Sequence, residues 1–347
     1  MKFLSEYEVA YNKDFQNTVI GGLSGIDHDR EKNLYYLLSD DRSERNPARF
    51  YEVEVIVRNN KIDSVIFLQT NFFKNNVSKV YPDSHNDPYH TPDPEAIRYN
   101  NRKNTILWCS EGERVVRPNR IVLEDPAITE TTIDGNYIDT FILPSQLHMQ
   151  RGESGPRQNG VFEGLAFADN YKTLFASVEE PLYNDGPRAG SGDSGGITRI
   201  LKYNTSSRKV IAQYAYMIDA VAHPAVPLGS FKINGISEIL SIGDNKLIVV
   251  ERSFSTGLPA CTIKVFLADL SAADNVDTVF SLKNKRGVKM VSKKLLLNTD
   301  SLGFYIDNIE GVTFGPTLTN GHSSLLFVSD NNFSSAQKTQ FLLFEIE

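Results

Sequence analysis

One pattern occurs five times along this chain at a nearly constant interval, and it limits the possible folds more than any other feature. Each copy has a short polar or acidic residue, then Gly or Ala, an apolar run, a polar turn, a second apolar run and an acidic residue. The copies begin at Ser24, Glu95, Glu163, Asn234 and Glu310, so their starts are 71, 68, 71 and 76 residues apart. Regular repeats of this kind are typical of propellers and solenoids, in which one supersecondary unit recurs.

Each repeat contains enough short β-runs for a four-stranded antiparallel sheet. Two further apolar runs follow the acidic residue in each of the first four repeats, for example NRIVLED and DTFILP in the second. The fifth repeat has only FLLFEIE before the chain ends, and the run EYEVAY at residues 6–11 would supply its missing strand. We therefore predict an all-β fold, a β-propeller of about five four-stranded blades whose ring is closed by pairing the N-terminal strand into the last blade. A sixth, degenerate blade is the alternative.

The whole chain, residues 1–347, is expected to form a single propeller domain. A chain of this length would otherwise suggest two domains. Apolar residues at helical spacing are not sustained anywhere, and residues 70–94, 151–161 and 181–196 are rich in the residues that favour long loops.

Composition excludes several classes of function. The net charge of −7 argues against nucleic acid as a partner, because binding to phosphates requires clustered Lys and Arg. No apolar run is long enough for a membrane span, and residues 1–15 lack the apolar core of a signal peptide. The two cysteines and six histidines show no metal-binding spacing, so zinc is not expected.

The acidic residues of the repeats are expected to gather in space. In an antiparallel pair, the start of the first strand and the end of the second strand lie at the same end of the hairpin. The corresponding pairs are 16 to 20 residues apart: Ser24 and Asp40, Glu95 and Glu111, Glu163 and Glu179, Asn234 and Glu251, and Glu310 and Asp330. If the first strand of each blade lines the central channel, these side chains converge around one mouth of the channel.

Converging carboxylates repel one another unless cations, shared protons or arginines intervene. Calcium is the cofactor that we expect, since it accepts six to eight oxygen ligands with loose geometry. The candidate metal ligands are Asp40, Asp41, Glu95, Glu111, Glu251, Glu310 and Asp330. The alternative is that the first-strand glutamates only bind the backbone of the neighbouring blade, whereas the second-strand acids followed by Arg, in SDDR and VVERS, favour a functional contact.

The glycine-rich stretch GSGDSGG at residues 190–196 is superficially similar to a phosphate-binding loop or to a serine-protease motif. No apolar strand precedes it, as a phosphate cradle would require. We therefore interpret it as part of the loop at residues 181–196.

Several motifs in order along the chain resemble those of the phytase-like family, whose description is esterase-like activity. They are LSGIDHD with LLSDDR, DPEAI with SEG, FEGLAF with VEE, and NIEGVTFGP with LLFVSDNNF, and the similarity extends from about Ser5 to Glu347. The resemblance implies a β-propeller that hydrolyses phosphate or other ester bonds with calcium as the expected cofactor, and that is exported to the periplasm or the outside of a bacterial cell.

Such chemistry assigns roles to the candidates. Glu163 and Glu179, with Arg157 and Arg252, are the predicted catalytic residues. The predicted substrate-binding residues are Arg42, Asn159 and Asn331, and the substrate is expected to be a small-molecule ester or phosphoester bound by a monomer.

Two other functions compete with this hypothesis. The first is a non-catalytic propeller that holds a sugar, a peptide or a cell-envelope partner at the same acidic mouth. The second is a lactonase-like calcium propeller that acts on carbon esters.

Overall fold

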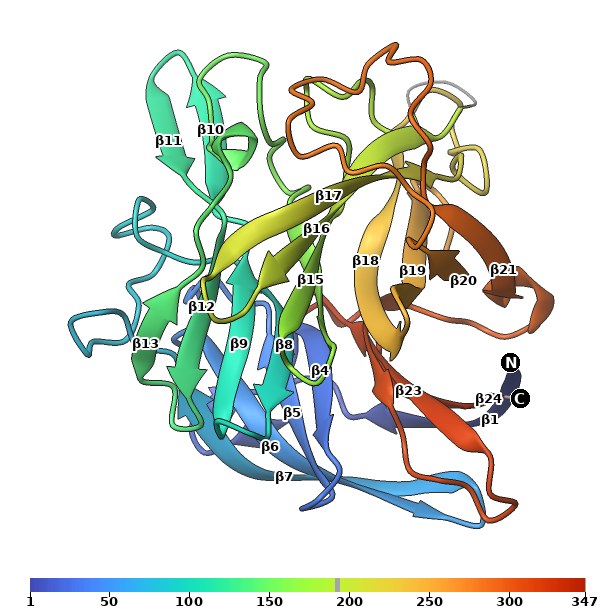
Figure 1. The fold of residues 1–347 in the computed structure, drawn as a ribbon. Coiled ribbons are helices and arrows are strands. Elements are labelled where there is room, and N and C mark those ends of the chain that lie inside the picture. Colours follow the sequence, from blue (N-terminus) through green and yellow to red (C-terminus); the bar gives the residue numbers. More distant parts are fainter. Residues whose placement is uncertain (191–193, 347) are drawn as a thin grey trace. The chain divides into compact units, whose positions relative to one another are not determined.

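The structure is a computed structural model that describes residues 1–190 and 194–346. The described residues form five four-stranded antiparallel sheets and two two-stranded hairpins (Figure 1). The predicted fold class is therefore confirmed: the chain is an all-β β-propeller with five four-stranded blades, and the described residues contain no sixth blade. Residues 191–193 of the predicted loop and of the GSGDSGG motif lie outside the described residues.

The chain divides into two compact units, which we describe separately. Unit 1 comprises Met1–Cys109, Ile128–Asp139 and Asp307–Glu347, and unit 2 comprises Ser110–Ala127 and Thr140–Ile306. That residues 1–347 act as a single domain stays a prediction.

Unit 1 holds three blades and a small hairpin. Blade 1 consists of β4 (Leu23–Asp29), β5 (Leu34–Ser39), β6 (Arg49–Arg58) and β7 (Lys61–Phe72). Blade 2 consists of β8 (Pro94–Asn100), β9 (Thr105–Ser110), β12 (Ala127–Thr132) and β13 (Tyr137–Thr140). Blade 5 consists of β22 (Asn308–Phe314), β23 (Ser323–Asp330), β24 (Thr339–Ile346) and β1 (Lys2–Val9), and the hairpin consists of β2 (Asp14–Phe15) and β3 (Thr18–Val19).

Unit 2 holds the other two blades. Blade 3 consists of β14 (Phe162–Ala168), β15 (Thr173–Val178), β16 (Gly196–Asn204) and β17 (Lys209–Ile218). Blade 4 consists of β18 (Lys232–Gly243), β19 (Lys246–Ser255), β20 (Thr262–Asp269) and β21 (Ser292–Asn298). A hairpin of β10 (Glu113–Arg117) and β11 (Arg120–Glu124), and the 3-10 turns η1 (Ser145–Leu147) and η2 (Thr299–Ser301), complete the unit.

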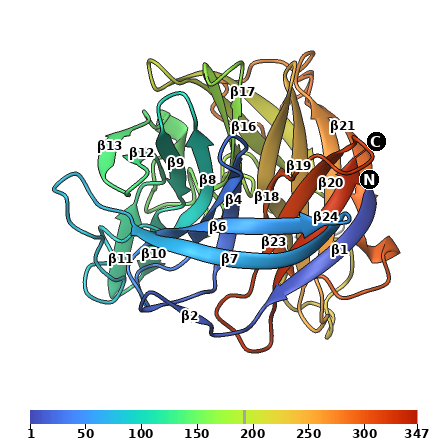
Figure 2. The same ribbon diagram turned by 90° about the horizontal axis from the view of Figure 1, so that it is seen from below.

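The N-terminal strand completes the last blade as predicted. β1 pairs antiparallel with β24, from Lys2 opposite Glu345 to Val9 opposite Thr339 (Figure 2). The strand starts earlier than the predicted run at residues 6–11 and ends at Val9, because a turn with Asn12 in the left-handed region follows. This pairing covers the edge of β24 that would otherwise be open for association with another chain.

One strand assignment from the sequence is wrong. The run NRIVLED was expected to be the third strand of the second blade, but it forms β11, which pairs with β10 outside the four-stranded sheets. The third strand of blade 2 is β12 instead. Alternation of apolar and polar residues predicts a strand but does not specify its partner.

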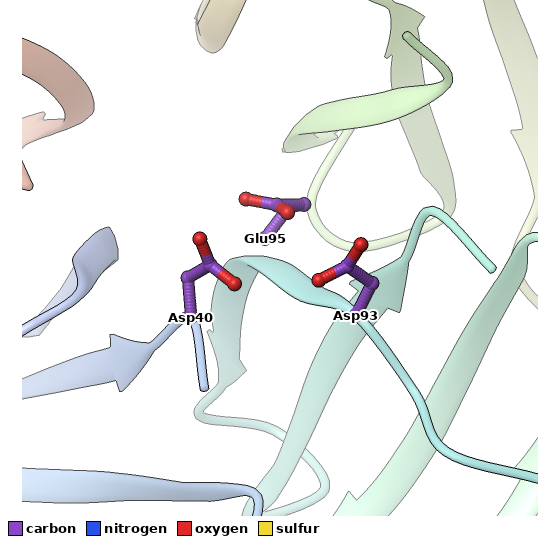
Figure 3. A group of neighbouring side chains, drawn as sticks. All are labelled: Asp40, Asp93 and Glu95. Atoms are coloured by element: carbon purple, nitrogen blue, oxygen red, sulfur yellow. The ribbon is translucent and has the colours of Figure 1, made fainter. Parts of the chain in front are cut away.

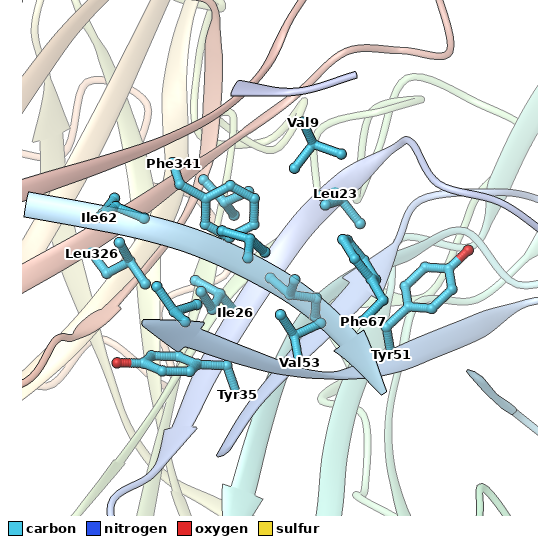
Figure 4. Packing of buried hydrophobic residues seen from close by; sticks show 14 of the residues in the cluster. Val9, Leu23, Ile26, Tyr35, Tyr51, Val53, Ile62, Phe67, Leu326 and Phe341 are labelled. Atoms are coloured by element: carbon cyan, nitrogen blue, oxygen red, sulfur yellow. The ribbon is translucent and has the colours of Figure 1, made fainter. Parts of the chain in front are cut away.

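The core of unit 1 lies between its blades. Val9 of β1, Leu23 and Ile26 of β4, Val53 of β6 and Phe341 of β24 belong to one buried cluster (Figure 4). Removing such a side chain from water contributes about 1.5–3 kcal/mol. Burial of this cluster therefore holds blade 1, blade 5 and the N-terminal strand together.

The glycine of the repeated pattern has a structural reason. A Cβ at Gly25 in β4 would lie 2.9 Å from both the carbonyl oxygen of Glu95 and the amide nitrogen of Ile97 in β8. In unit 2, a Cβ at Gly164 in β14 would lie 2.7 Å from the amide nitrogen of Ile239 in β18. The absent side chain lets first strands of neighbouring blades approach closely.

Within the described part of the chain, none of the helical segments has the length and apolar character needed to cross a membrane.

Candidate functional site

Three carboxylates of unit 1 form the strongest candidate for a cation site, which we call the acidic triad. Asp40 follows the end of β5, Asp93 immediately precedes β8, and Glu95 is the second residue of β8. Each offers an oxygen, and these oxygens all lie within 4.8 Å of one another. Figure 3 shows the three carboxylates facing one another.

The backbone around β4 holds the triad together. The amide of Asp40 donates to the carbonyl of Gly22 at 2.6 Å, which fixes the end of β5 beside the start of β4. The hydroxyl of Ser24 donates to the carbonyl of Glu95 at 2.8 Å, which fixes the start of β8 on the other side. The first residues of the repeated pattern therefore bring together acids that are 55 positions apart in the sequence.

The triad lies largely out of water, and Arg42 is a cationic neighbour of it. Asp93 and Glu95 are buried, and Asp40 is half-buried. Arg42 Nη1 lies 3.2 Å from Asp93 Oδ2. Three carboxylates at this separation repel one another strongly, and Arg42 compensates part of this charge. Hard oxygen donors in this arrangement suit a cation such as calcium.

Asp41, which is adjacent to Asp40, has a different environment. Its Oδ2 lies 2.7 Å from Nη1 of Arg49, and both side chains are almost completely buried. Its carboxylate also accepts the amides of Glu44 at 2.9 Å, Arg45 at 3.2 Å and Asn46 at 3.0 Å. These bonds favour a structural role for Asp41 over metal binding.

Three more predicted residues of unit 1 take part in local hydrogen bonds. Asn331 Oδ1 accepts the amides of Gly22 at 3.1 Å and Phe333 at 3.0 Å. Glu310 Oε1 accepts from the side-chain amide of Asn308 at 2.9 Å. Asp330 Oδ1 accepts the amide of Asn332 at 2.8 Å.

Unit 2 contains a second charged group, which we call the glutamate–arginine cluster. Glu179 and Glu180 follow the end of β15, and both are buried. Glu179 Oε1 lies 2.8 Å from Nη2 of Arg252, and Glu180 Oε2 lies 2.7 Å from Nε of Arg188. Each of the two adjacent carboxylates therefore has its own arginine.

The surroundings of Glu180 change its pKa. Burial, together with the neighbouring charge of Glu179, raises the pKa of Glu180 to about 8, although Arg188 and Arg157 oppose this rise. Glu180 is therefore mostly protonated at neutral pH and can act as a proton donor.

Arg157, a predicted catalytic residue, supports the adjacent loop. Its Nε donates to the carbonyl of Pro181 at 2.9 Å, and its Nη2 donates to the carbonyl of Gly186 at 2.8 Å. The guanidinium also lies 4.1 Å from the ring centroid of Tyr183, and burial lowers the pKa of Arg157. Most of its donors therefore fix residues 181–186.

The predicted metal ligand Glu251 is fully engaged by protein groups. Its Oε1 accepts from Tyr216 at 2.8 Å and Lys293 at 2.5 Å, and its Oε2 accepts from the amide of Asp219 at 2.9 Å and from Asn234 at 2.8 Å. This arrangement favours a structural role.

The remaining predicted residues of unit 2 are Glu111, Glu163 and Asn159. Glu111 accepts the amide of Val161 in a short hydrogen bond. Glu163 is buried in β14, and Asn159 is exposed with a left-handed backbone (φ 45°).

Comparison with known proteins identifies the family. The family described as "Phytase-like: Esterase-like activity of phytase" matches residues 18–333. This chain belongs to the phytase-like family. No protein among the curated sequences matches it.

Solved structures similar to this phytase-like chain have low sequence identity. A GH43 β-1,3-galactosidase with galactodeoxynojirimycin is 10% identical over 98% of this chain and 94% of its own, with a TM-score of 0.49. An endo-arabinase from Bacteroides thetaiotaomicron is 10% identical over 94% and 95%, with a TM-score of 0.47. The arabinanase Arb43A from Bacillus subtilis is 11% identical over 94% of each chain, with a TM-score of 0.45.

The structure adds residues that sequence reasoning missed. Asp93 completes the acidic triad, and its signal was its place in the motif DPEAI, two residues before Glu95. Glu180 is the last residue of the motif VEE, and its raised pKa depends on burial that the sequence does not show. No sequence feature pointed to Arg188 as a site residue, because it lies in a loop.

Proposed function

We propose that this phytase-like protein hydrolyses small-molecule ester or phosphoester bonds with the help of calcium bound at the acidic triad. The observation that carries the proposal is the convergence of Asp40, Asp93 and Glu95, three carboxylates whose oxygens lie within 4.8 Å of one another. Calcium bound there would polarise a carbonyl or phosphoryl oxygen and lower the pKa of a bound water.

The donor set fits calcium better than its common competitors. All three ligands are carboxylates, without the Cys and His that zinc prefers. Magnesium requires near-ideal octahedral geometry, whereas calcium tolerates carboxylates from separate segments, such as the β5 end and the β8 start.

Arg42 gives the triad a preference for anionic substrates. Its side chain is 17% exposed and is oriented by Asp93. A guanidinium in this position donates charge-assisted hydrogen bonds to a carboxylate or phosphate oxygen. The substrate-binding roles of Asn159 and Asn331 stay proposals, and for Asn331 the hydrogen bonds to Gly22 and Phe333 argue for a structural role.

The glutamate–arginine cluster supplies acid–base chemistry in unit 2. Glu180 is protonated near neutral pH, so that it can protonate a leaving alcohol, and Arg252 compensates the charge of Glu179, which can accept a proton. We keep Glu163 and Glu179 as catalytic residues and add Glu180. Arg157 acts as a positioning residue, since its donors hold the loop at residues 181–186.

Export to the periplasm or the cell exterior and a monomeric state are further parts of the proposal. The competing function is a non-catalytic binding propeller. The hydrogen bonds of Asp41 and Glu251 support this alternative, since they favour a structural role for two of the predicted acids.

Calcium titration by calorimetry on chelator-stripped protein tests the proposal, with hydrolysis of p-nitrophenyl phosphate and p-nitrophenyl acetate followed on the same samples. We expect calcium-dependent turnover that is lost in Asp40→Asn and Asp93→Asn and strongly reduced in Glu163→Gln. Asp134→Asn, which removes an exposed carboxylate of unit 1, is the matched control.

The outcomes separate the candidate functions. Calcium binding without turnover of either ester would favour a binding propeller, and turnover of acetate but not phosphate would favour a lactonase-like enzyme. Turnover that persists in chelator and in both aspartate variants would contradict a catalytic calcium site.

A further inference from the structure

Unit 2 contains a pocket whose lining includes no residue of the glutamate–arginine cluster. Its volume is about 260 Å³, and three segments form its walls. The first runs from η1 to Gly155, the second contributes Asn184, and the third contributes Phe280. The volume lies just below the ~300–1,000 Å³ of typical small-molecule sites, so the ligand must be small.

The lining of this pocket is polar and almost uncharged. Gln146, Gln150 and Ser154 contribute amide and hydroxyl groups, and Phe280, which is 65% exposed, contributes an aromatic ring. No lysine, arginine or carboxylate is among the described lining residues. A charged ligand would lose hydration here without gaining a counter-charge, so the lining favours a neutral ligand.

Two lining side chains have defined hydrogen-bonding capacity. Asn184 Oδ1 accepts from the amide of Gly155 at 2.6 Å and from the hydroxyl of Ser154 at 3.2 Å, which leaves its Nδ2 hydrogens without a partner among the described residues. His148 Nδ1 lies 2.6 Å from Asp125 Oδ2. In the tautomer in which Nδ1 donates to Asp125, Nε2 is an acceptor. The pocket thus offers both donors and acceptors.

A buried ion pair fixes the walls that carry Asn184 and Phe280. Asp185 and Arg199 are completely buried, with Oδ2 and Nε 2.6 Å apart. Arg199 Nη2 also donates to the carbonyl of Val279 at 2.8 Å, next to Phe280. Asp185 Oδ1 accepts the amide of Leu282 at 2.8 Å. A pocket whose walls are preformed loses less entropy when a ligand binds.

The wall at Gln150 is also anchored. Arg114 Nε donates to the carbonyl of Gln150 at 3.0 Å, and its Nη2 donates to the carbonyl of Gly152 at 2.9 Å. The Arg114 guanidinium lies 4.9 Å from the ring centroid of Tyr183, the residue before Asn184. The first and second segments are therefore tied to one side chain.

We propose that this pocket binds a neutral polyhydroxylated ligand of the size of one sugar residue. Sugar hydroxyls both donate and accept, which matches the amides, the hydroxyls and His148 Nε2. The C–H face of a sugar ring is apolar and can pack on the exposed ring of Phe280. The site is independent of the proposed hydrolytic activity, because it shares no residue with the acidic triad or the glutamate–arginine cluster.

Saturation-transfer NMR with full-length protein tests this proposal, with glucose, galactose, mannose and N-acetylglucosamine as separate probes. A ligand of this size is expected to bind in the millimolar range. Phe280→Ala removes the stacking surface, and Asn184→Asp removes the Nδ2 donors but keeps the oxygen that Gly155 and Ser154 require. Each is expected to weaken binding of the preferred sugar by about tenfold or more.

Phe231→Ala is the matched control, since Phe231 is another exposed aromatic residue of unit 2 at 54% exposure. It should leave binding unchanged, and thermal unfolding should show that both aromatic variants fold. Absence of saturation transfer to all four sugars would refute the proposal. Binding that survives both pocket variants, or that is stronger for acetate or phosphate than for any sugar, would do so as well.

Discussion

Two adjacent aspartates, Asp40 and Asp41, allow a direct test of which acids bind calcium and which stabilise the fold. Asp40 belongs to the acidic triad, whereas Asp41 pairs with the buried Arg49 at 2.7 Å. Asn has nearly the same size as Asp, so Asp40→Asn and Asp41→Asn remove charge with little change in volume. The two variants are expected to fail in different ways.

For Asp41→Asn we expect a loss of stability. Removing one partner of a buried ion pair costs about 3–5 kcal/mol. Arg49 keeps bonds to the carbonyl of Val19 at 2.9 Å and to the hydroxyl of Tyr51 at 2.7 Å, so the lower end, about 3 kcal/mol, applies. With an unfolding entropy of about 2.1 cal/mol/K per residue over 347 residues, this loss lowers Tm by about 4 °C.

For Asp40→Asn we expect the opposite pattern. Loss of one charge from three neighbouring carboxylates relieves repulsion, so the calcium-free protein should be at least as stable as the wild type. Calcium affinity should fall about tenfold or more, because affinity depends on the number of charged ligands.

Thermal unfolding in chelator and in increasing calcium measures both effects. Calcium that binds only the folded state raises Tm of the wild type, and above Kd the rise grows with the logarithm of the calcium concentration. Asp41→Asn should begin lower and keep this calcium-dependent rise, whereas Asp40→Asn should lose it. The reasoning is refuted if Asp41→Asn is as stable as the wild type, or if Asp40→Asn keeps the full calcium-dependent rise.

Three further perturbations have definite expected results. Because Glu180 binds its proton more tightly when folded, with a pKa of about 8, unfolding free energy should fall as pH rises from about 4.5 to 8, and Glu180→Gln should flatten this dependence in urea denaturation. A wild-type stability that is constant over this range would contradict the raised pKa. Gly25→Ala places a Cβ 2.9 Å from the carbonyl of Glu95, so it should lower stability by about 1–3 kcal/mol and weaken calcium binding, unlike Gly152→Ala, whose Cβ meets nothing within 4 Å. Equal calorimetric titrations for the two glycine variants would show that Gly25 does not position the triad. Deletion of Lys2–Val9 exposes the edge of β24 and should produce oligomers visible by light scattering. A truncated protein that remains monodisperse would show that the edge needs no cover.

Local pattern sufficed to predict the blades. The five repeat starts lie within two residues of the first residues of β4, β8, β14, β18 and β22. Two features mark the starts, an apolar strand and a small residue, which is Gly in four copies and Ala96 in the second, and both are visible in the sequence. The run NRIVLED, which forms β11, was assigned to a blade because its alternation is the same as that of a blade strand, and pairing depends on contacts that alternation does not specify.

The roles of the acids were less predictable than their positions. Asp40 and Asp41 occupy one motif, SDDR, and both were candidate metal ligands. What separates them is the turn at residues 44–46, whose amides point at Asp41, and the buried side chain of Arg49. Both are consequences of the folded loop, so residue type and spacing alone could not assign them.

The arginines that follow the acids show why such motifs mislead. In SDDR and VVERS, an acid followed by Arg was interpreted as favouring a functional contact. In unit 1, Arg42 of blade 1 instead pairs with Asp93, next to β8 of blade 2. In unit 2, Arg252 of blade 4 pairs with Glu179, next to β15 of blade 3. Each arginine thus links two blades while it compensates an acid of a candidate site. Loss of activity in an arginine variant therefore identifies a catalytic contribution only if blade stability, measured on the same protein, is unchanged.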